Sequence, residues 1–118
     1  MKRIKSRFTP YNDGILFVCQ PESAQSSFNA VKNTTAKKDI KRIIQLNYVE
    51  LNRRDRDFEF AESQGRTLSM KVKTRLYSRA NSNHMIMIGN RLYSIFDIDK
   101  DTRTEEMYLY LEEIRRLT

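Results

Sequence analysis

The chain has 118 residues, of which 22 are Lys or Arg and 15 are Asp or Glu, giving a formal net charge of +7. This length predicts a single domain over residues 1–118 with one modest core. One His, one Cys and three Gly are too few for a Cys/His zinc site, a disulfide framework or a glycine-rich phosphate loop. We therefore expect no bound metal, no cofactor and no enzymatic activity.

The sequence contains no evident targeting or membrane segment. The basic start is not followed by an apolar stretch of signal-peptide length, and no run approaches the length of a membrane span. A single cysteine, Cys19, suits a reducing compartment. We expect a soluble protein, made in a cytoplasm, that has no membrane partner.

Positive charge is concentrated toward the N-terminus. Residues 1–42 carry a net charge of +6, residues 43–75 carry +2, and residues 76–118 carry −1. The N-terminal third could face a polyanion, or it could simply keep the chain in solution.

The N-terminal region predicts a hairpin followed by a long loop. The triplet Asn12-Asp13-Gly14 is strong turn chemistry, and residues 15–19 are apolar enough for a mostly buried strand. Residues 20–39 are polar and aperiodic, which indicates a long loop that is either functional or a floppy insertion. We expect that removal of residues 24–38 would leave the fold intact.

Residues 40–51 carry two competing patterns. Ile40, Ile43 and Ile44 fit a helical stripe, whereas the following residues alternate as in a strand. We favour a strand over residues 45–51.

A short charged helix is expected over residues 53–63. Asn52 and Asp55 resemble a capping pair, and Gly65 is a plausible stop just after the last turn. Phe58 and Phe60 leave open the alternative of a strand, because they are spaced two residues apart.

The second half predicts further antiparallel strands. Leu68, Met70 and Val72 alternate with polar residues, as in a half-buried strand. Gly89-Asn90 predicts a tight hairpin turn. The expected elements are strands at 67–75, 85–88, 91–96 and 106–114, a polar tip at 78–83, a charged turn at 97–104, and a short basic tail at 115–118.

The expected fold is mainly β: a small antiparallel β-barrel or sandwich-like domain with one short helix and a long polar loop. Such an arrangement contains five or six short strands, with no internal repeat.

Three features that suggest chemistry are better explained by structure. The acidic run from Asp97 to Asp101 resembles the opening of a calcium loop, but Thr102 and Tyr108 occupy the positions of the required Gly and Glu. His84 has no metal-binding partner and predicts a loop-edge imidazole. Cys19 lies within an apolar run and predicts a buried small residue.

Two charged groups are candidates for binding a partner. The first group consists of basic residues on or beside the long loop, and we expect either a loop that lies near DNA or ordinary solvated charge. Its members are Lys32, Lys37, Lys38, Lys41 and Arg42. The second group lies in the expected helix, and we expect either a solvated helix face with local ion pairs or an interface with another protein subunit. Its members are Arg53, Arg54, Asp55, Arg56, Asp57 and Glu59.

The order of several segments resembles the head-tail joining, or head-closure, proteins of tailed bacteriophages. The resemblance covers about residues 45–114, and Tyr48 stands where that family usually has Trp. The segments are 47–51 (NYVEL), 53–62 (RRDRDFEFAE), 68–75 (LSMKVKTR), 85–95 (MIMIGNRLYSI), 99–103 (DKDTR) and 108–113 (YLYLEE).

The resemblance implies a virion protein at the head-tail interface. Such a subunit would form a homo-oligomeric ring beneath portal and adaptor proteins and seal the portal channel after DNA packaging. It would contact packaged double-stranded DNA without sequence specificity and provide a docking surface for tail proteins. Two alternatives remain open: a tail-terminator or tail-completion ring subunit, and a stand-alone nucleic-acid-binding barrel. The last would need aromatic residues on an exposed strand face, for which Tyr108 and Tyr110 are the clearest pair.

Overall fold

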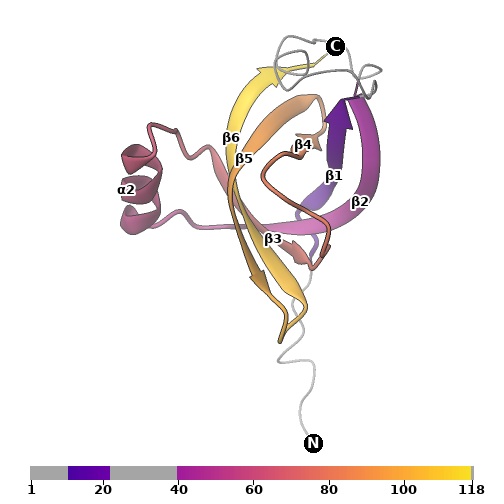
Figure 1. Ribbon diagram of the computed structural model, residues 1–118, viewed down its shortest axis with the longest axis horizontal. Coiled ribbons are helices and arrows are strands. Elements are labelled where there is room, and N and C mark those ends of the chain that lie inside the picture. The colour runs from indigo at the N-terminus through magenta and orange to yellow at the C-terminus, as the bar shows by residue number, and fades with distance from the viewer. Residues whose placement is uncertain (1–10, 22–39, 118) are drawn as a thin grey trace, which may run out of the picture.

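The computed structural model of the protein describes residues 11–21 and 40–117. Six antiparallel strands close into a barrel in the order β1-β2-β3-β6-β5-β4 (Figure 1). The prediction of a mainly β fold is confirmed. Of the two expected forms, barrel or sandwich, the structure is a closed barrel. The strands are β1 (Gly14–Pro21), β2 (Ile40–Leu51), β3 (Met70–Arg75), β4 (Met85–Ile88), β5 (Arg91–Asp101) and β6 (Glu106–Arg116).

One helix, α2 (Asp55–Ser63), interrupts the strand order between β2 and β3. In Figure 1 it stands to one side of the barrel, connected to it by two extended segments. The short helix expected at residues 53–63 is therefore confirmed, and the strand alternative for Phe58 and Phe60 is wrong.

The barrel interior is filled by alternating residues of the strands. Leu16 and Val18 of β1 meet Val72 of β3 and Leu109 of β6, and all four side chains are fully buried. Alternation places successive side chains on opposite faces, so the period of two in the sequence becomes the inner face of the barrel.

A second apolar cluster lies outside this interior and contains Cys19, Met85, Met87 and Leu92. Met85 and Met87 belong to this cluster, while Ile86 between them belongs to the interior. Strand β4 is therefore apolar on both faces, which explains why its sequence is a continuous apolar run rather than an alternating one.

Strand β2 begins five residues earlier than expected. Pro21 pairs with Ile40, and the pairing with β1 continues to Tyr48, so the helical pattern of Ile40, Ile43 and Ile44 was misleading. Isoleucine is β-branched and packs well on a pleated surface, which favours the strand once β1 supplies a partner.

The charged turn expected at residues 97–104 is shorter than the prediction. Strand β5 continues to Asp101, which pairs with Glu106, and the turn is confined to residues 102–105. Charged side chains do not end an antiparallel strand whose outer face is open to water. The expected basic tail is also wrong, because Arg115 and Arg116 belong to β6 and Leu117 is buried.

The Gly89-Asn90 hairpin is confirmed between β4 and β5. Gly89 has a φ of 60°, the value that a type II′ turn requires of its first central residue. The expected loop at 20–39 lies outside the described residues except for Gln20 and Pro21, which end β1. The first arm of the expected N-terminal hairpin also lies outside them; β1 itself pairs with β2 and β4.

Candidate subunit interface

Helix α2 is an insertion into the hairpin that joins β2 to β3. Leu51, the last residue of β2, pairs with Lys71 near the start of β3. The two strands are thus adjacent without the helix, and the chain leaves the barrel between them to form α2. The helix is therefore an appendage of the barrel wall, where a contact with another molecule can form without disturbing the core.

The helix is capped by Asp57, and not by the expected pair of Asn52 and Asp55. The Asp57 carboxylate accepts a hydrogen bond of 2.9 Å from the Arg54 backbone N–H, and the Asp57 N–H donates to the Arg54 carbonyl. The capping pattern lies two residues later because the helix begins at Asp55. The helix ends as expected, with Gly65 at a φ of 67° just beyond it.

Asp57 also connects the helix to the barrel. The Lys71 ammonium on β3 lies 3.1 Å from its carboxylate, and both side chains are almost completely buried. Burial would raise the pKa of the Asp57 carboxyl, but the Arg54 N–H and the Lys71 ammonium outweigh it and hold that pKa below its ordinary value. Asp57 is therefore buried and used within the chain, and its predicted place in a subunit interface stays a prediction.

Arg53 is likewise used within the chain. Its guanidinium donates to the carbonyls of Ser69, at 2.9 Å, and Leu68, at 3.3 Å. These bonds join the two ends of the inserted segment, so Arg53 fixes where the helix leaves the barrel.

A row of aromatic rings supports the other flank of the helix. Phe60 lies 6.1 Å from Phe96 of β5, and Phe96 lies 6.2 Å from Tyr110 of β6, measured between ring centroids. Arg66 lies over the Phe96 ring, donates to Ser94, and forms an ion pair of 2.5 Å with Glu112. Among these contacts, the Phe60–Phe96 pair joins α2 to the barrel, and the others anchor the segment that follows the helix.

Two large apolar side chains remain exposed on this helix. Phe58 is 44% exposed and Phe60 is 41% exposed, whereas Asp57 and Ala61 are buried. Residues 58 and 60 lie about 160° apart around an α-helix, so each ring occupies a different flank. Exposed aromatic residues next to arginines are typical of protein-protein contacts.

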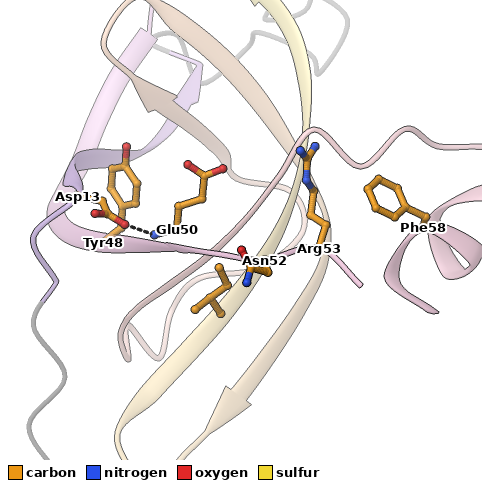
Figure 2. A pocket seen from close by; sticks show the side chains of 7 residues that line it. Asp13, Tyr48, Glu50, Asn52, Arg53 and Phe58 are labelled. Atoms are coloured by element: carbon orange, nitrogen blue, oxygen red, sulfur yellow. Dashed lines mark hydrogen bonds between the residues drawn. The ribbon is translucent and has the colours of Figure 1, made fainter. Parts of the chain in front are cut away.

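An open hollow of about 820 Å³ lies beside the Phe58 flank. Figure 2 shows Phe58 and Arg53 on one side of it, and Asp13, Tyr48 and Glu50 on the other. The Asp13 carboxylate accepts a hydrogen bond of 2.7 Å from the Glu50 backbone N–H. The hollow therefore lies between the barrel wall and the helix and leaves one face of Phe58 accessible.

The remaining predicted interface residues are exposed on α2 or at its start: Arg54, Asp55, Arg56 and Glu59. The expected ion pairs within the helix are not formed among the described residues. Glu62, which the prediction did not include, is exposed as well. The surface of the helix thus carries exposed charges of both signs that form no ion pair within the described residues.

The predicted DNA-proximal group is only partly described. Lys32, Lys37 and Lys38 lie outside the described residues, and Lys41 and Arg42 are exposed on β2. The Arg42 guanidinium lies 4.4 Å above the Phe17 ring, which orients it on the barrel surface.

His84, Cys19 and the acidic run from Asp97 to Asp101 all lie in surroundings that explain them without catalysis or metal binding. His84 accepts a hydrogen bond at Nδ1 from the Asn81 N–H, and burial together with Lys100 lowers its pKa. Burial raises the pKa of the Cys19 thiol to about 12. The run from Asp97 to Asp101 is part of strand β5, so the calcium-loop pattern is not a loop. Within residues 11–21 and 40–117, no three His, Cys, Asp or Glu side chains could together hold a metal ion.

Comparison with known proteins leaves the family open: no family model matches the chain, and no curated protein matches it. Within the described residues, no helix has the length and apolar character needed to cross a membrane.

Sequence reasoning missed the residues that hold the helix to the barrel. Arg66, Lys71 and Phe96 belong to three different segments, and their meeting depends on the order of strands in the barrel. The hollow was missed for the same reason. The exposed aromatics were visible in the sequence, as two Phe in a short and otherwise charged helix.

Proposed function

We propose that the chain is a structural subunit of a tailed bacteriophage particle. In this proposal it forms a ring below the portal and adaptor proteins, closes the head after DNA packaging, and offers a docking surface to tail proteins. No residue needs to perform chemistry in such a role.

One observation carries the proposal. The segments that resemble the head-closure family fall on β2, α2, β3, the β4–β5 hairpin and β6. These elements and β1 make up one closed barrel with its inserted helix, which supports reading the segments as parts of one domain.

The exposed surface of α2 supports a role in assembly. Arg54, Asp55, Arg56 and Glu59 are open to other molecules, and they stand next to two half-exposed phenylalanines. A protein that works by contacts with its neighbours needs such a surface on a rigid element. We assign contacts with neighbouring virion proteins to this helix.

Contact with packaged DNA is assigned to the basic residues at the start of β2. Lys41 and Arg42 are exposed there, and a ring would repeat them once per subunit. Lysine and arginine bind phosphates without reading sequence, which suits a protein that meets whatever DNA lies in the channel.

The stand-alone nucleic-acid-binding alternative receives less support. Burial raises the pKa of the Tyr108 and Tyr110 hydroxyls, and nearby carboxylates, including that of Asp99, raise it further, although the Lys71 ammonium lies over the Tyr110 ring. A polyanion is repelled by such carboxylates. The tail-terminator alternative differs only in where on the particle the ring lies.

The test is an add-back experiment with heads that lack this chain and have just been packaged in vitro, before their DNA has leaked out. We expect nuclease to digest the DNA that leaks from these heads, and purified chain added before the nuclease to protect it. If the heads retain their DNA equally well without the chain, it does not close the head.

A further inference from the structure

Helix α2 and its N-cap residue carry a stripe of three exposed residues. Two copies of this stripe, placed antiparallel, would bring opposite charges together. Arg54, Phe58 and Glu62 are spaced four residues apart, which places them in one row along the helix. The Phe58 N–H donates to the Arg54 carbonyl at 3.2 Å, so the row continues into the residue that precedes the helix. Read along the chain, the stripe is cation, aromatic ring, anion.

The two charges are placed against the preference of their own helix. A cation near the N-terminus and an anion near the C-terminus both oppose the helix dipole. Asp55 and Asp57 of the first turn agree with the dipole, but the last turn contains no basic residue to balance Glu62. Neither Arg54 nor Glu62 forms an ion pair with any residue that the structure describes. Such an arrangement disfavours the isolated helix, which indicates that the charges serve another contact.

We propose that α2 pairs antiparallel with α2 of a second copy of this chain through the Arg54–Phe58–Glu62 stripe. Phe58 is the midpoint of the stripe, so a two-fold axis at Phe58 places the two phenyl rings together. The same axis brings Arg54 of each copy opposite Glu62 of the other. Antiparallel packing also places the positive end of each helix dipole beside the negative end of the other, which is favourable.

The hollow provides room for this contact. It adjoins Phe58, is open to solvent, and its volume of about 820 Å³ exceeds that of a phenylalanine side chain several-fold. Arg53 lies over one face of the Phe58 ring, at 5.5 Å, and the second ring would pack on the remaining exposed part. The Phe60 flank carries no equivalent stripe, because its row is Arg56, Phe60 and Gln64 and lacks the anion.

This contact is distinct from the one that closes a ring. A two-fold contact joins like surfaces and pairs two chains, whereas a ring requires two different surfaces. Arg56 lies on the opposite side of the helix from Phe58 and stays available to other neighbours. The inference therefore stands or falls separately from the proposed function.

Sedimentation velocity of the purified chain over a concentration series tests the pairing. We expect a monomer-dimer equilibrium, weakened at least about ten-fold by Arg54→Glu or by Glu62→Arg, because each variant places like charges opposite each other twice. A mixture of the two single variants should form heterodimers, since every pair is then of opposite charge. The double variant Arg54→Glu/Glu62→Arg should dimerise like the original chain.

The matched control is Arg56→Glu, which reverses an exposed charge on the opposite side of the helix from Phe58 and should leave the dissociation constant unchanged. Circular dichroism checks that each variant is folded. A wild-type chain that stays monomeric over the whole series would overturn the pairing. So would a dimer that single reversals within the stripe do not weaken, or one that the mixture fails to restore. DNA retention by heads is a separate measurement and reports on the proposed function alone.

Discussion

Asp57 is the residue on which the placement of α2 depends most. It caps the helix through the Arg54 N–H and is the ion-pair partner of Lys71. Replacement by Asn keeps the shape but removes the charge, leaving the buried Lys71 ammonium without its partner. We expect Asp57→Asn to lower the free energy of unfolding by about 1–3 kcal/mol in denaturant titrations. Asp55→Asn, at an exposed position two residues earlier, should change it far less.

The same carboxyl predicts a pH dependence. Its pKa in the folded chain is below the ordinary value, so its contribution is complete above the unfolded pKa and is lost as the pH falls through the folded one. Wild-type stability should therefore fall more steeply than that of Asp57→Asn below about pH 4. Parallel acid titrations of the two proteins, followed by unfolding at each pH, measure the difference. Equal slopes would show that Asp57 carries no such charge effect.

Gly14 is required by its neighbour Tyr48. A Cβ at residue 14 would lie 3.0 Å from Cε1 and 3.1 Å from Oη of the buried Tyr48 ring. We expect Gly14→Ala to cost about 1–3 kcal/mol of stability through overpacking, in addition to the strain of a side chain at a φ of 156°. In a Tyr48→Leu background the cost should shrink, and a double-mutant cycle measures that coupling. Additive effects would contradict the close contact as the cause.

At the scale of elements, α2 should be dispensable for the barrel. The Arg53 guanidinium lies 2.9 Å from the Ser69 carbonyl, and Leu51 already pairs with Lys71. Replacing residues 54–64 with a short Gly/Ser loop should leave a folded barrel that no longer self-associates. Amide NMR spectra would test this by retaining the dispersed signals of strand residues. A collapsed spectrum would show instead that the helix is needed to form the sheet.

The elements also show how far local sequence patterns reach. The alternation in β3 and β6 and the Gly89-Asn90 turn predicted those elements well, because each pattern records the burial of its own residues. The start of β2 and the end of β5 were mispredicted because a distant strand decides them: β1 extends β2 to Ile40, and β6 extends β5 to Asp101. The intrinsic strand or turn propensity of a residue has less influence than pairing with a neighbouring strand.

The candidate site was predictable only in part, for the same reason. The charges of α2 and its two Phe could be recognised from the sequence, but Asp57 could not be separated from its exposed neighbours. Its burial depends on Lys71, which lies fourteen residues further along the chain. The hollow depends on Asp13 meeting Glu50 across the β1–β2 pair.

At the scale of the whole molecule, the net charge of +7 predicts salt-dependent binding to DNA. Reversing Lys41 and Arg42 together should weaken binding to double-stranded DNA and lower the slope of log affinity against log salt by about 2. Fluorescence anisotropy with a labelled duplex measures both quantities. The control, Arg79→Glu with Arg103→Glu, changes the net charge equally at other exposed positions. Equal losses in the two variants would show that only total charge matters.

The proposed closure of the head would be a property of the assembled particle. Its most direct test is negative-stain microscopy of heads purified with and without this chain. We expect heads made without it to be empty of DNA and tailless, and heads made with it to be filled. Filled heads with abnormal tails in the absence of the chain would contradict head closure and assign the protein to the tail.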